Sequence, residues 1–158
     1  MGSKNKLKRF QENETLPNVI QPNRESLINE SFGYKANWHT YFENNNPIIL
    51  ELGCGKGEYT VAMAQQNPDC NYIGIDIKGA RFWRGAKTAY EEQLSNVVFV
   101  RTQIELIENL FTAGEVSEIW LTFPDPQLKF KRTKHRLTNP KFLQKYQRVL
   151  KPKGVIHL

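Results

Sequence analysis

Cysteine is scarce in this chain of 158 residues, which contains only Cys54 and Cys70. Two cysteines are too few for a disulfide framework or a zinc site. The three histidines, His39, His135 and His157, have no spacing typical of metal ligands. We therefore predict no metal site, and we expect the reducing cytoplasm as the compartment.

Long apolar runs are also lacking. No stretch approaches the roughly 20 residues of a membrane span, and the polar N-terminus has no signal-peptide core, so we expect no membrane partner. The length suits one domain, since domains typically have about 100–150 residues. The net charge of +6 favours an anionic partner, with a merely solvated basic surface as the alternative. The sequence leaves the oligomeric state open.

The first 46 residues are polar, with a basic start and two prolines. We interpret residues 1–46 as a mobile arm followed by a short packing segment around Trp38, Tyr41 and Phe42. Such an arm either contacts nucleic acid or stays disordered, and disorder is the more common outcome for a terminus of this composition.

From residue 47 onward, short apolar runs alternate with helical stretches. Strands that alternate with helices indicate a parallel sheet covered on both faces, so we predict a doubly wound, mainly parallel α/β fold, Rossmann-like, for residues 47–158. The predicted strands are 48–52, 72–75, 97–100, 119–123 and 155–158, and the predicted helices are 58–66, 80–93, 104–111 and 140–150.

The last predicted strand, 155–158, coincides with the end of the sequence. A sheet that stopped there would present an unpaired edge. We therefore expect the sequence to be a truncated version of a longer protein that lacks its C-terminal strands.

The first predicted strand runs directly into Gly53, Gly55 and Gly57. Glycines permit a tight turn and let a ligand approach the backbone. In a doubly wound sheet, ligands bind at the carboxyl ends of the strands. A tight strand-to-helix turn without a ligand is the alternative, because two glycines with this spacing are a weak signal.

Two carboxylates near the loop narrow the choice of ligand. Glu51 precedes the glycines, where it would repel phosphates but suit a cationic ligand such as S-adenosylmethionine (SAM). Asp76 ends the second strand about 20 residues after the loop, the position from which a carboxylate reaches ribose hydroxyls. The dinucleotide fingerprint would place a glycine at Glu58, which disfavours NAD.

These residues carry a resemblance. The segment from Glu51 through Gly57 resembles motif I of class I SAM methyltransferases, and Leu150–Val155 resembles the turn before their fifth strand. In that fold, the end of the third strand contacts the adenine, and the corresponding residue here is Gln103. The resemblance implies SAM bound by Glu51, Gly53, Gly55, Asp76, Gln103 and Asp125; for Gln103, an exposed residue at a helix start is the alternative.

A second motif follows the fourth predicted strand. Pro124 and Pro126 restrict the backbone around Asp125, which suits a carboxylate that orients a substrate. A dense run of cations comes next, and such a run attracts phosphates without reading sequence. A structural turn and a solvated basic loop are the alternatives. The cations assigned to RNA binding are Lys129, Lys131, Arg132, Lys134 and Arg136.

This second motif resembles the tRNA (guanine-N7-)-methyltransferase family. Phe123-Pro-Asp-Pro and Leu137-Thr-Asn-Pro-Lys-Phe-Leu match its hallmarks, and the resemblance covers about residues 48–158. Gln127 departs from the family's usual tryptophan, which puts a stacking role there in doubt. The family also has substrate-contacting residues after the fifth strand, and these are absent from this sequence.

The resemblance implies methyl transfer from SAM to N7 of a guanine in the tRNA variable loop. Asp125 would act as the catalytic residue that orients the guanine, and Lys129 would hold a nearby phosphate or base. A small-molecule SAM methyltransferase and a non-catalytic RNA-binding module on the same scaffold are the alternatives. A NAD-dependent oxidoreductase is disfavoured by Glu51 and Glu58.

Overall fold

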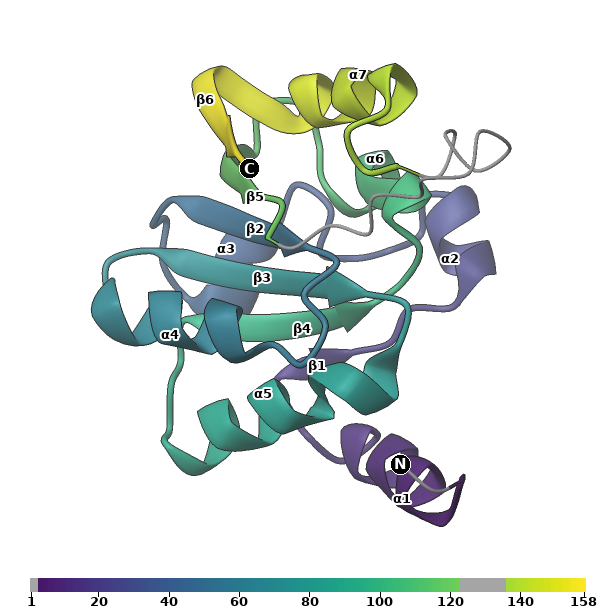
Figure 1. The fold of residues 1–158 in the computed structure, drawn as a ribbon. Coiled ribbons are helices and arrows are strands. Elements are labelled where there is room, and N and C mark those ends of the chain that lie inside the picture. The colour runs from purple at the N-terminus through teal and green to yellow at the C-terminus, as the bar shows by residue number, and fades with distance from the viewer. Residues whose placement is uncertain (1–2, 123–135) are drawn as a thin grey trace.

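A single parallel sheet organises the computed structural model, which describes residues 3–122 and 136–158. Within these residues the strand order is β1-β4-β3-β2-β5-β6, and every pairing is parallel (Figure 1). The predicted doubly wound α/β fold is therefore confirmed. The strands are β1 Val19–Ile20, β2 Ile48–Leu52, β3 Asn71–Asp76, β4 Val97–Arg101, β5 Val116–Trp120 and β6 Leu150–His157. The helices are α1 Ser3–Asn13, α2 Arg24–Ile28, α3 Trp38–Phe42, α4 Glu58–Gln66, α5 Gly79–Glu91, the 3-10 helix η1 Ile104–Leu106, α6 Ile107–Leu110 and α7 Pro140–Val149.

Helices cover both faces of the sheet (Figure 1). On one face, α4 and α5 bury apolar side chains against β2, β3 and β4 around Phe99. On the other face, α2, α3, α6 and α7 form a larger core around Leu50 and Ile73. The central strands are buried on both sides, which explains why each is a continuous apolar run.

Two strand predictions were displaced. Strand β5 begins at Val116 and ends at Trp120, whereas 119–123 was predicted. Strand β5 pairs with β2 from Glu118 to Trp120, and Val116 pairs with Leu150 of β6. Ser117 and Glu118 are polar and half-buried, so no apolar run marks the start of this strand. Strand β6 begins at Leu150, five residues before the predicted start, and its pairing with β5 contains a register shift.

Residues 1–46 were interpreted from the sequence as a mobile arm followed by a packing segment around Trp38, and the part that the structure describes has regular secondary structure before that segment. Residues 3–46 contain α1, β1, α2 and α3, and β1 extends the sheet beside β4. Two buried asparagines fasten this segment to α5: Asn13 Nδ2 donates to the Gly79 carbonyl at 3.0 Å, and Asn18 Nδ2 donates to the Ala86 carbonyl at 2.9 Å. The polar composition therefore serves long-range hydrogen bonds.

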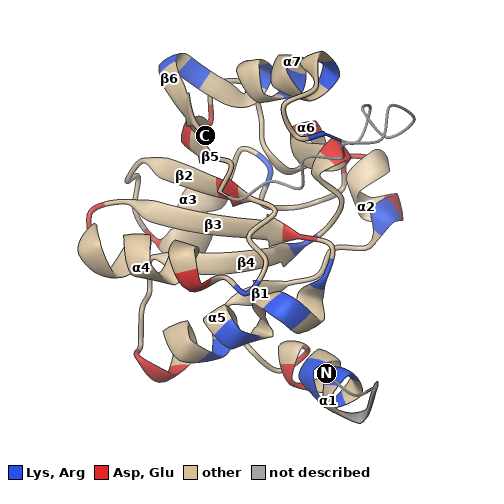
Figure 2. Cartoon of the chain, viewed as in Figure 1, with Lys and Arg blue, Asp and Glu red and all other residues tan. Residues whose placement is uncertain are grey.

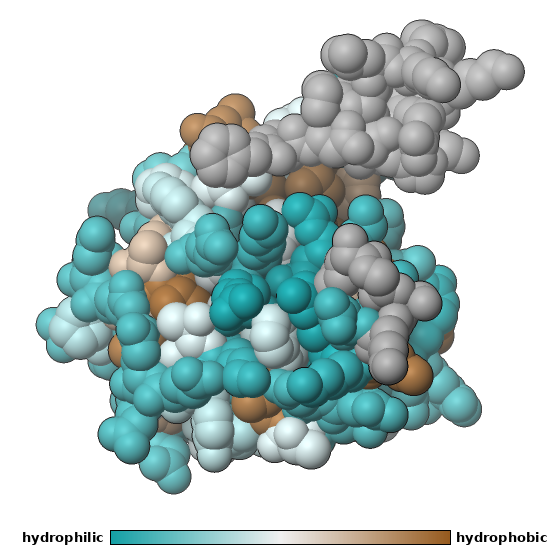
Figure 3. Space-filling view, turned by 60° about the horizontal axis from the view of Figure 1, so that its bottom comes forward, coloured by the Kyte–Doolittle hydropathy of each residue, from teal (hydrophilic) through white to brown (hydrophobic). Residues whose placement is uncertain are grey.

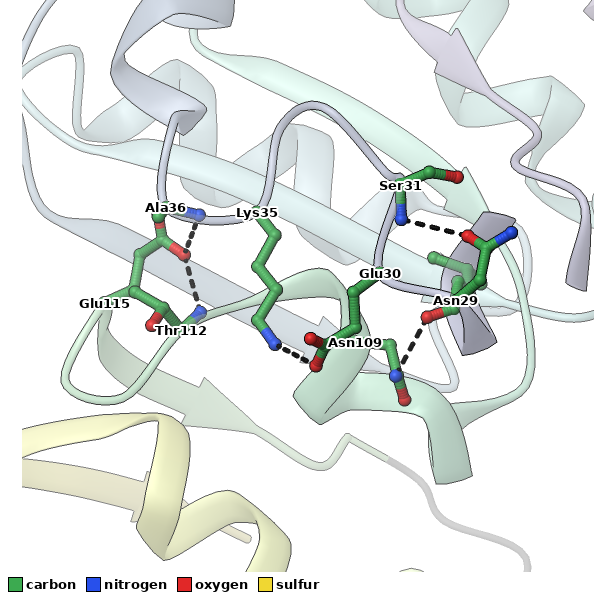
Figure 4. A network of polar contacts seen from close by, with 9 residues as sticks. Asn29, Glu30, Ser31, Lys35, Ala36, Asn109, Thr112 and Glu115 are labelled. Carbon is green, nitrogen blue, oxygen red and sulfur yellow. Dashed lines mark hydrogen bonds and ion pairs between the residues drawn. The ribbon is translucent and has the colours of Figure 1, made fainter. Parts of the chain in front are cut away.

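The segment after α2 is fastened to the opposite face. Trp38 is fully buried, stacks on Phe111 with ring centroids 5.6 Å apart, and donates from Nε1 to the Leu110 carbonyl at 3.0 Å. Figure 4 shows the polar contacts nearby, where the Glu115 carboxylate accepts from the backbone N–H groups of Ala36 and Thr112. Residues 3–46 thus wrap around the sheet and reach both of its faces.

Candidate functional site

The loop between β2 and α4 turns on three glycines. Gly53, Gly55 and Gly57 have φ values of +71°, +56° and +76°, in the left-handed region that favours glycine. A Cβ on Gly57 would lie 2.6 Å from the Phe99 ring, so this glycine lets the loop pack on the sheet. A Cβ on Gly53 or Gly55 would have no neighbour closer than 3.4 Å. A Cβ at either position would therefore make only ordinary van der Waals contacts, with Leu137 at Gly53 and with Arg81 at Gly55, so no crowding within the chain requires glycine at these two positions.

Asp76 ties this loop to the carboxyl end of β3. Its Oδ2 accepts from the Gly55 N–H at 2.9 Å, and its Oδ1 accepts from the Lys78 N–H at 2.9 Å. A carboxylate oxygen can accept more than one hydrogen bond. Both oxygens of Asp76 thus keep acceptor capacity for ligand hydroxyls while the backbone holds the group in place.

Glu51 lies deeper than the sequence suggests. Its side chain is 1% exposed, and its two oxygens accept hydrogen bonds from the hydroxyls of Thr60 and Thr122. Burial raises the pKa of this carboxyl, and the two threonine hydrogen bonds act in the opposite direction. Glu51 joins β2 to α4 and to the chain after β5. Direct contact between Glu51 and a cationic ligand stays a prediction.

A hollow of about 400 Å³ lies at the ends of β3 and β4. On its wall, Arg24 Nη1 donates to Gln103 Oε1 at 2.5 Å. Arginine cannot accept hydrogen bonds, so the amide oxygen of Gln103 must face the guanidinium, which leaves its NH₂ group to donate elsewhere. Ile77, directly after Asp76, is 48% exposed and adds an apolar surface. The hollow is lined by Gln21, Pro22, Asn23, Arg24, Ile77, Arg101, Thr102, Gln103 and Leu106.

Sequence reasoning missed Ile77 and Arg24. An apolar residue directly after Asp76, where the predicted strand has already ended, was a usable signal for Ile77. Arg24 has no local signal, because it is separated from Gln103 by 79 residues and arrives through the pairing of β1 with β4.

The predicted site residues divide into three groups. The structure places Glu51, Gly53, Gly55, Asp76 and Gln103 at or just after the carboxyl ends of β2, β3 and β4. Arg136 is half-buried just before α7. The remaining predicted residues, Asp125, Lys129, Lys131, Arg132 and Lys134, lie outside the described residues.

Other chemistries have little support in the described parts of the chain. In residues 3–122 and 136–158, no three His, Cys, Asp or Glu side chains are grouped so that they could hold a metal ion. None of the described helices is long and apolar enough to cross a membrane. Burial raises the pKa of the Cys54 thiol well above its ordinary value, so this loop cysteine is a packing residue.

Known proteins resemble the chain in sequence and in fold. Residues 45–158 match a family model described as "Putative methyltransferase". A tRNA (guanine-N(7)-)-methyltransferase of Christiangramia forsetii is 68% identical over 100% of this chain and 71% of its own length. The same enzyme of Bacteroides thetaiotaomicron is 51% identical over 98% of this chain and 61% of its own length.

Solved structures agree on the fold. The antibiotic-resistance methyltransferase Kmr superposes with a TM-score of 0.62 at 21% identity, over 78% of this chain and 60% of Kmr. At this identity the likeness shows the fold alone. The family follows instead from the matched family model and the relatives in sequence. This chain belongs to the tRNA (guanine-N(7)-)-methyltransferase family.

Proposed function

We propose that this chain transfers the methyl group of SAM to N7 of a guanine in the variable loop of tRNA, in the cytoplasm. The observation that carries the proposal is the Asp76 carboxylate held against the glycine loop, in a chain 68% identical to a tRNA (guanine-N(7)-)-methyltransferase. The relatives that carry this name are longer, because the chain spans 71% and 61% of the two compared above.

The residues at the strand ends fit the adenosine part of SAM. Asp76 would accept hydrogen bonds from the two ribose hydroxyls through its remaining lone pairs. Gly53 and Gly55 would let the amino-acid part lie along the backbone, where no Cβ intervenes. The free NH₂ group of Gln103 would donate to a ring nitrogen of adenine, and Ile77 would cover one face of the ring.

SAM supplies a methyl group activated by its positively charged sulfur. Guanine N7 carries a free lone pair at neutral pH, so the protein needs no general base to create the nucleophile. The protein's contribution is then mainly to hold N7 in line with the methyl group. Asp125 would accept from the donors on the guanine Watson–Crick edge, and Lys129, Lys131, Arg132, Lys134 and Arg136 would bind the RNA backbone.

Glu51 connects the two halves of this site. It accepts from Thr122, which lies three residues before Asp125 in the sequence. It also accepts from Thr60 on the helix that follows the glycine loop. We assign Glu51 the role of positioning the base of the substrate loop relative to the cofactor loop.

The test uses the natural full-length protein, radiolabelled SAM and unmodified tRNA transcripts. We expect label on a transcript with guanine at the variable-loop target. We expect none when that base is adenine or 7-deazaguanine, because 7-deazaguanine lacks only the N7 acceptor. Equal labelling of the 7-deazaguanine transcript would exclude N7, and SAM binding with no labelled tRNA would favour a small-molecule acceptor.

Asp125→Ala and Asp125→Asn separate the two predicted roles of that residue. If Asp125 orients guanine, both variants lose turnover by 100-fold or more while the Kd for SAM changes much less. A parallel loss of SAM affinity would instead assign Asp125 to the cofactor.

A further inference from the structure

A second hollow, of about 230 Å³, lies between α1 and α5, away from the cofactor loop. At its centre is the indole of Trp83, which is 9% exposed. Three cations surround this ring. The Arg9 guanidinium lies 4.5 Å from a ring centroid, and the Arg84 guanidinium and the Lys87 ammonium each lie 5.1 Å from one. The hollow is lined by Asn5, Lys8, Arg9, Glu12, Trp83 and Lys87.

Negative charge at this hollow comes from Glu12. Its Oε2 accepts from Trp83 Nε1 at 2.9 Å and pairs with Lys87 Nζ at 3.3 Å. The hydrogen bond from Trp83 and the nearby Lys87 lower the pKa of Glu12, so it is ionised at neutral pH. Glu12 thus fixes the indole and offsets one cation. Arg9 and Arg84 add positive charge around the same ring, and Lys8 lines the hollow.

This arrangement concentrates like charges. Cations held around one aromatic side chain gain from the ring but repel one another. An anion placed among them would remove the repulsion and could take a bidentate hydrogen bond from a guanidinium. A phosphate group has the charge and the size for a hollow of about 230 Å³.

The positive charge continues along α5 towards the cofactor loop. Arg81, Arg84 and Lys87 follow one another at three-residue spacing, and residues three apart are neighbours on a helix. Arg81 Nη2 lies 3.6 Å from the point where a Cβ on Gly55 would be. Figure 2 shows blue segments on α1 and along α5, and the face turned forward in Figure 3 is largely hydrophilic.

We propose that the Trp83 hollow and the cations of α5 form a second RNA-contact surface, in which the hollow binds a backbone phosphate of the tRNA while the target base reaches the cofactor loop. This inference rests on the proposed function. The row of cations ends at the loop predicted to hold the methyl donor, which favours the nucleic-acid substrate over a lipid surface as the source of phosphate. Contacts of this kind bind without reading sequence.

The test compares two triple charge reversals in the natural full-length protein. Lys8→Glu/Arg9→Glu/Arg84→Glu changes the proposed surface. Lys141→Glu/Lys151→Glu/Lys153→Glu is the matched control, because it changes net charge equally through exposed residues on α7 and β6. Binding of an unmodified tRNA transcript is measured over a salt series, and SAM affinity confirms that each variant is folded.

We expect the first variant to weaken tRNA binding at least tenfold and to reduce the salt dependence by about one ion per lost phosphate contact. We expect the control to change binding less than threefold. Equal weakening by both variants, or no weakening by the first, would overturn the inference. If the triple variant does not fold, Lys8→Gln and Arg84→Gln, which change exposed side chains, give the same comparison with a smaller expected effect.

Failure of this inference and failure of the proposed function give different results. If the unaltered protein methylates tRNA but the first variant binds it normally, only the second contact surface is refuted. If the unaltered protein neither binds nor methylates tRNA, the proposed function fails and this inference fails with it.

Discussion

The glycine loop allows backbone strain, packing and ligand binding to be separated with three alanine substitutions. Gly55, Gly57 and Gly114 all have φ between +56° and +76°, so alanine at each should cost about 1–2 kcal/mol in conformational energy. At Gly114 no atom lies within 4 Å of the new Cβ, so alanine adds no steric clash to this conformational cost. At Gly57 the Cβ would lie 2.6 Å from the buried Phe99 ring, and overpacking adds roughly 1–3 kcal/mol.

We therefore expect Gly57→Ala to lower the free energy of unfolding by about 2–5 kcal/mol, and Gly114→Ala by about 1–2 kcal/mol. Gly55→Ala should match Gly114→Ala in stability but lose SAM affinity, because its Cβ enters the space beside the loop. Urea denaturation measures the first quantity and calorimetric titration with SAM the second. The reasoning is refuted if Gly57→Ala costs no more than Gly114→Ala, or if Gly55→Ala binds SAM normally.

Three further substitutions test the site and the core. Burial raises the pKa of Glu51, so ionising this carboxyl in the folded protein costs stability. In urea denaturation, the unfolding free energy of the natural protein minus that of Glu51→Gln should therefore fall as the pH rises above 4.5. A difference that rises with pH would contradict this. Arg24→Met should weaken SAM binding, because Arg24 holds the Gln103 amide in place. In a double-mutant cycle, Arg24→Met should change SAM affinity little once Gln103 is alanine. Additive losses of SAM affinity would show that Arg24 acts elsewhere. Trp38→Phe removes the indole N–H that donates to the Leu110 carbonyl and leaves a void in the core. The free energy of unfolding, measured by heat or urea, should therefore fall by about 2–4 kcal/mol. A fall below about 1 kcal/mol would show that the site repacks.

The central part of the fold was predictable because burial on both faces leaves a simple pattern. The bounds predicted for β2, 48–52, and for α4, 58–66, are those observed. Strand β5 was displaced because the polar, half-buried Ser117 and Glu118 separate the buried Val116 from Ile119, so the apolar run alone does not mark where the strand begins. The position of Asp76 beside the glycine loop was likewise predictable from the order of strands in doubly wound sheets.

The contribution of the N-terminal segment was not predictable from local patterns. Asn13 and Asn18 look like loop residues, yet both are buried and donate to carbonyls of α5. The hydrogen bond from Arg24 to Gln103 was equally unpredictable, because its two partners are far apart in the chain. Such contacts depend on the complete fold, and no window of sequence contains both partners.

The early position of α1 and β1 in the chain has a consequence during synthesis. Asn13 leaves the ribosome before Gly79, its hydrogen-bonding partner, which is 66 residues later. At about 5–20 residues per second, the partner is made roughly 3–13 seconds afterwards. Until then α1 has no α5 on which to pack, and β1 waits longer still for β4, its partner strand. We infer that this segment docks after the central strands have formed. In the nascent chain, β1 then pairs with the free edge of β4 and prevents that edge from pairing with other chains.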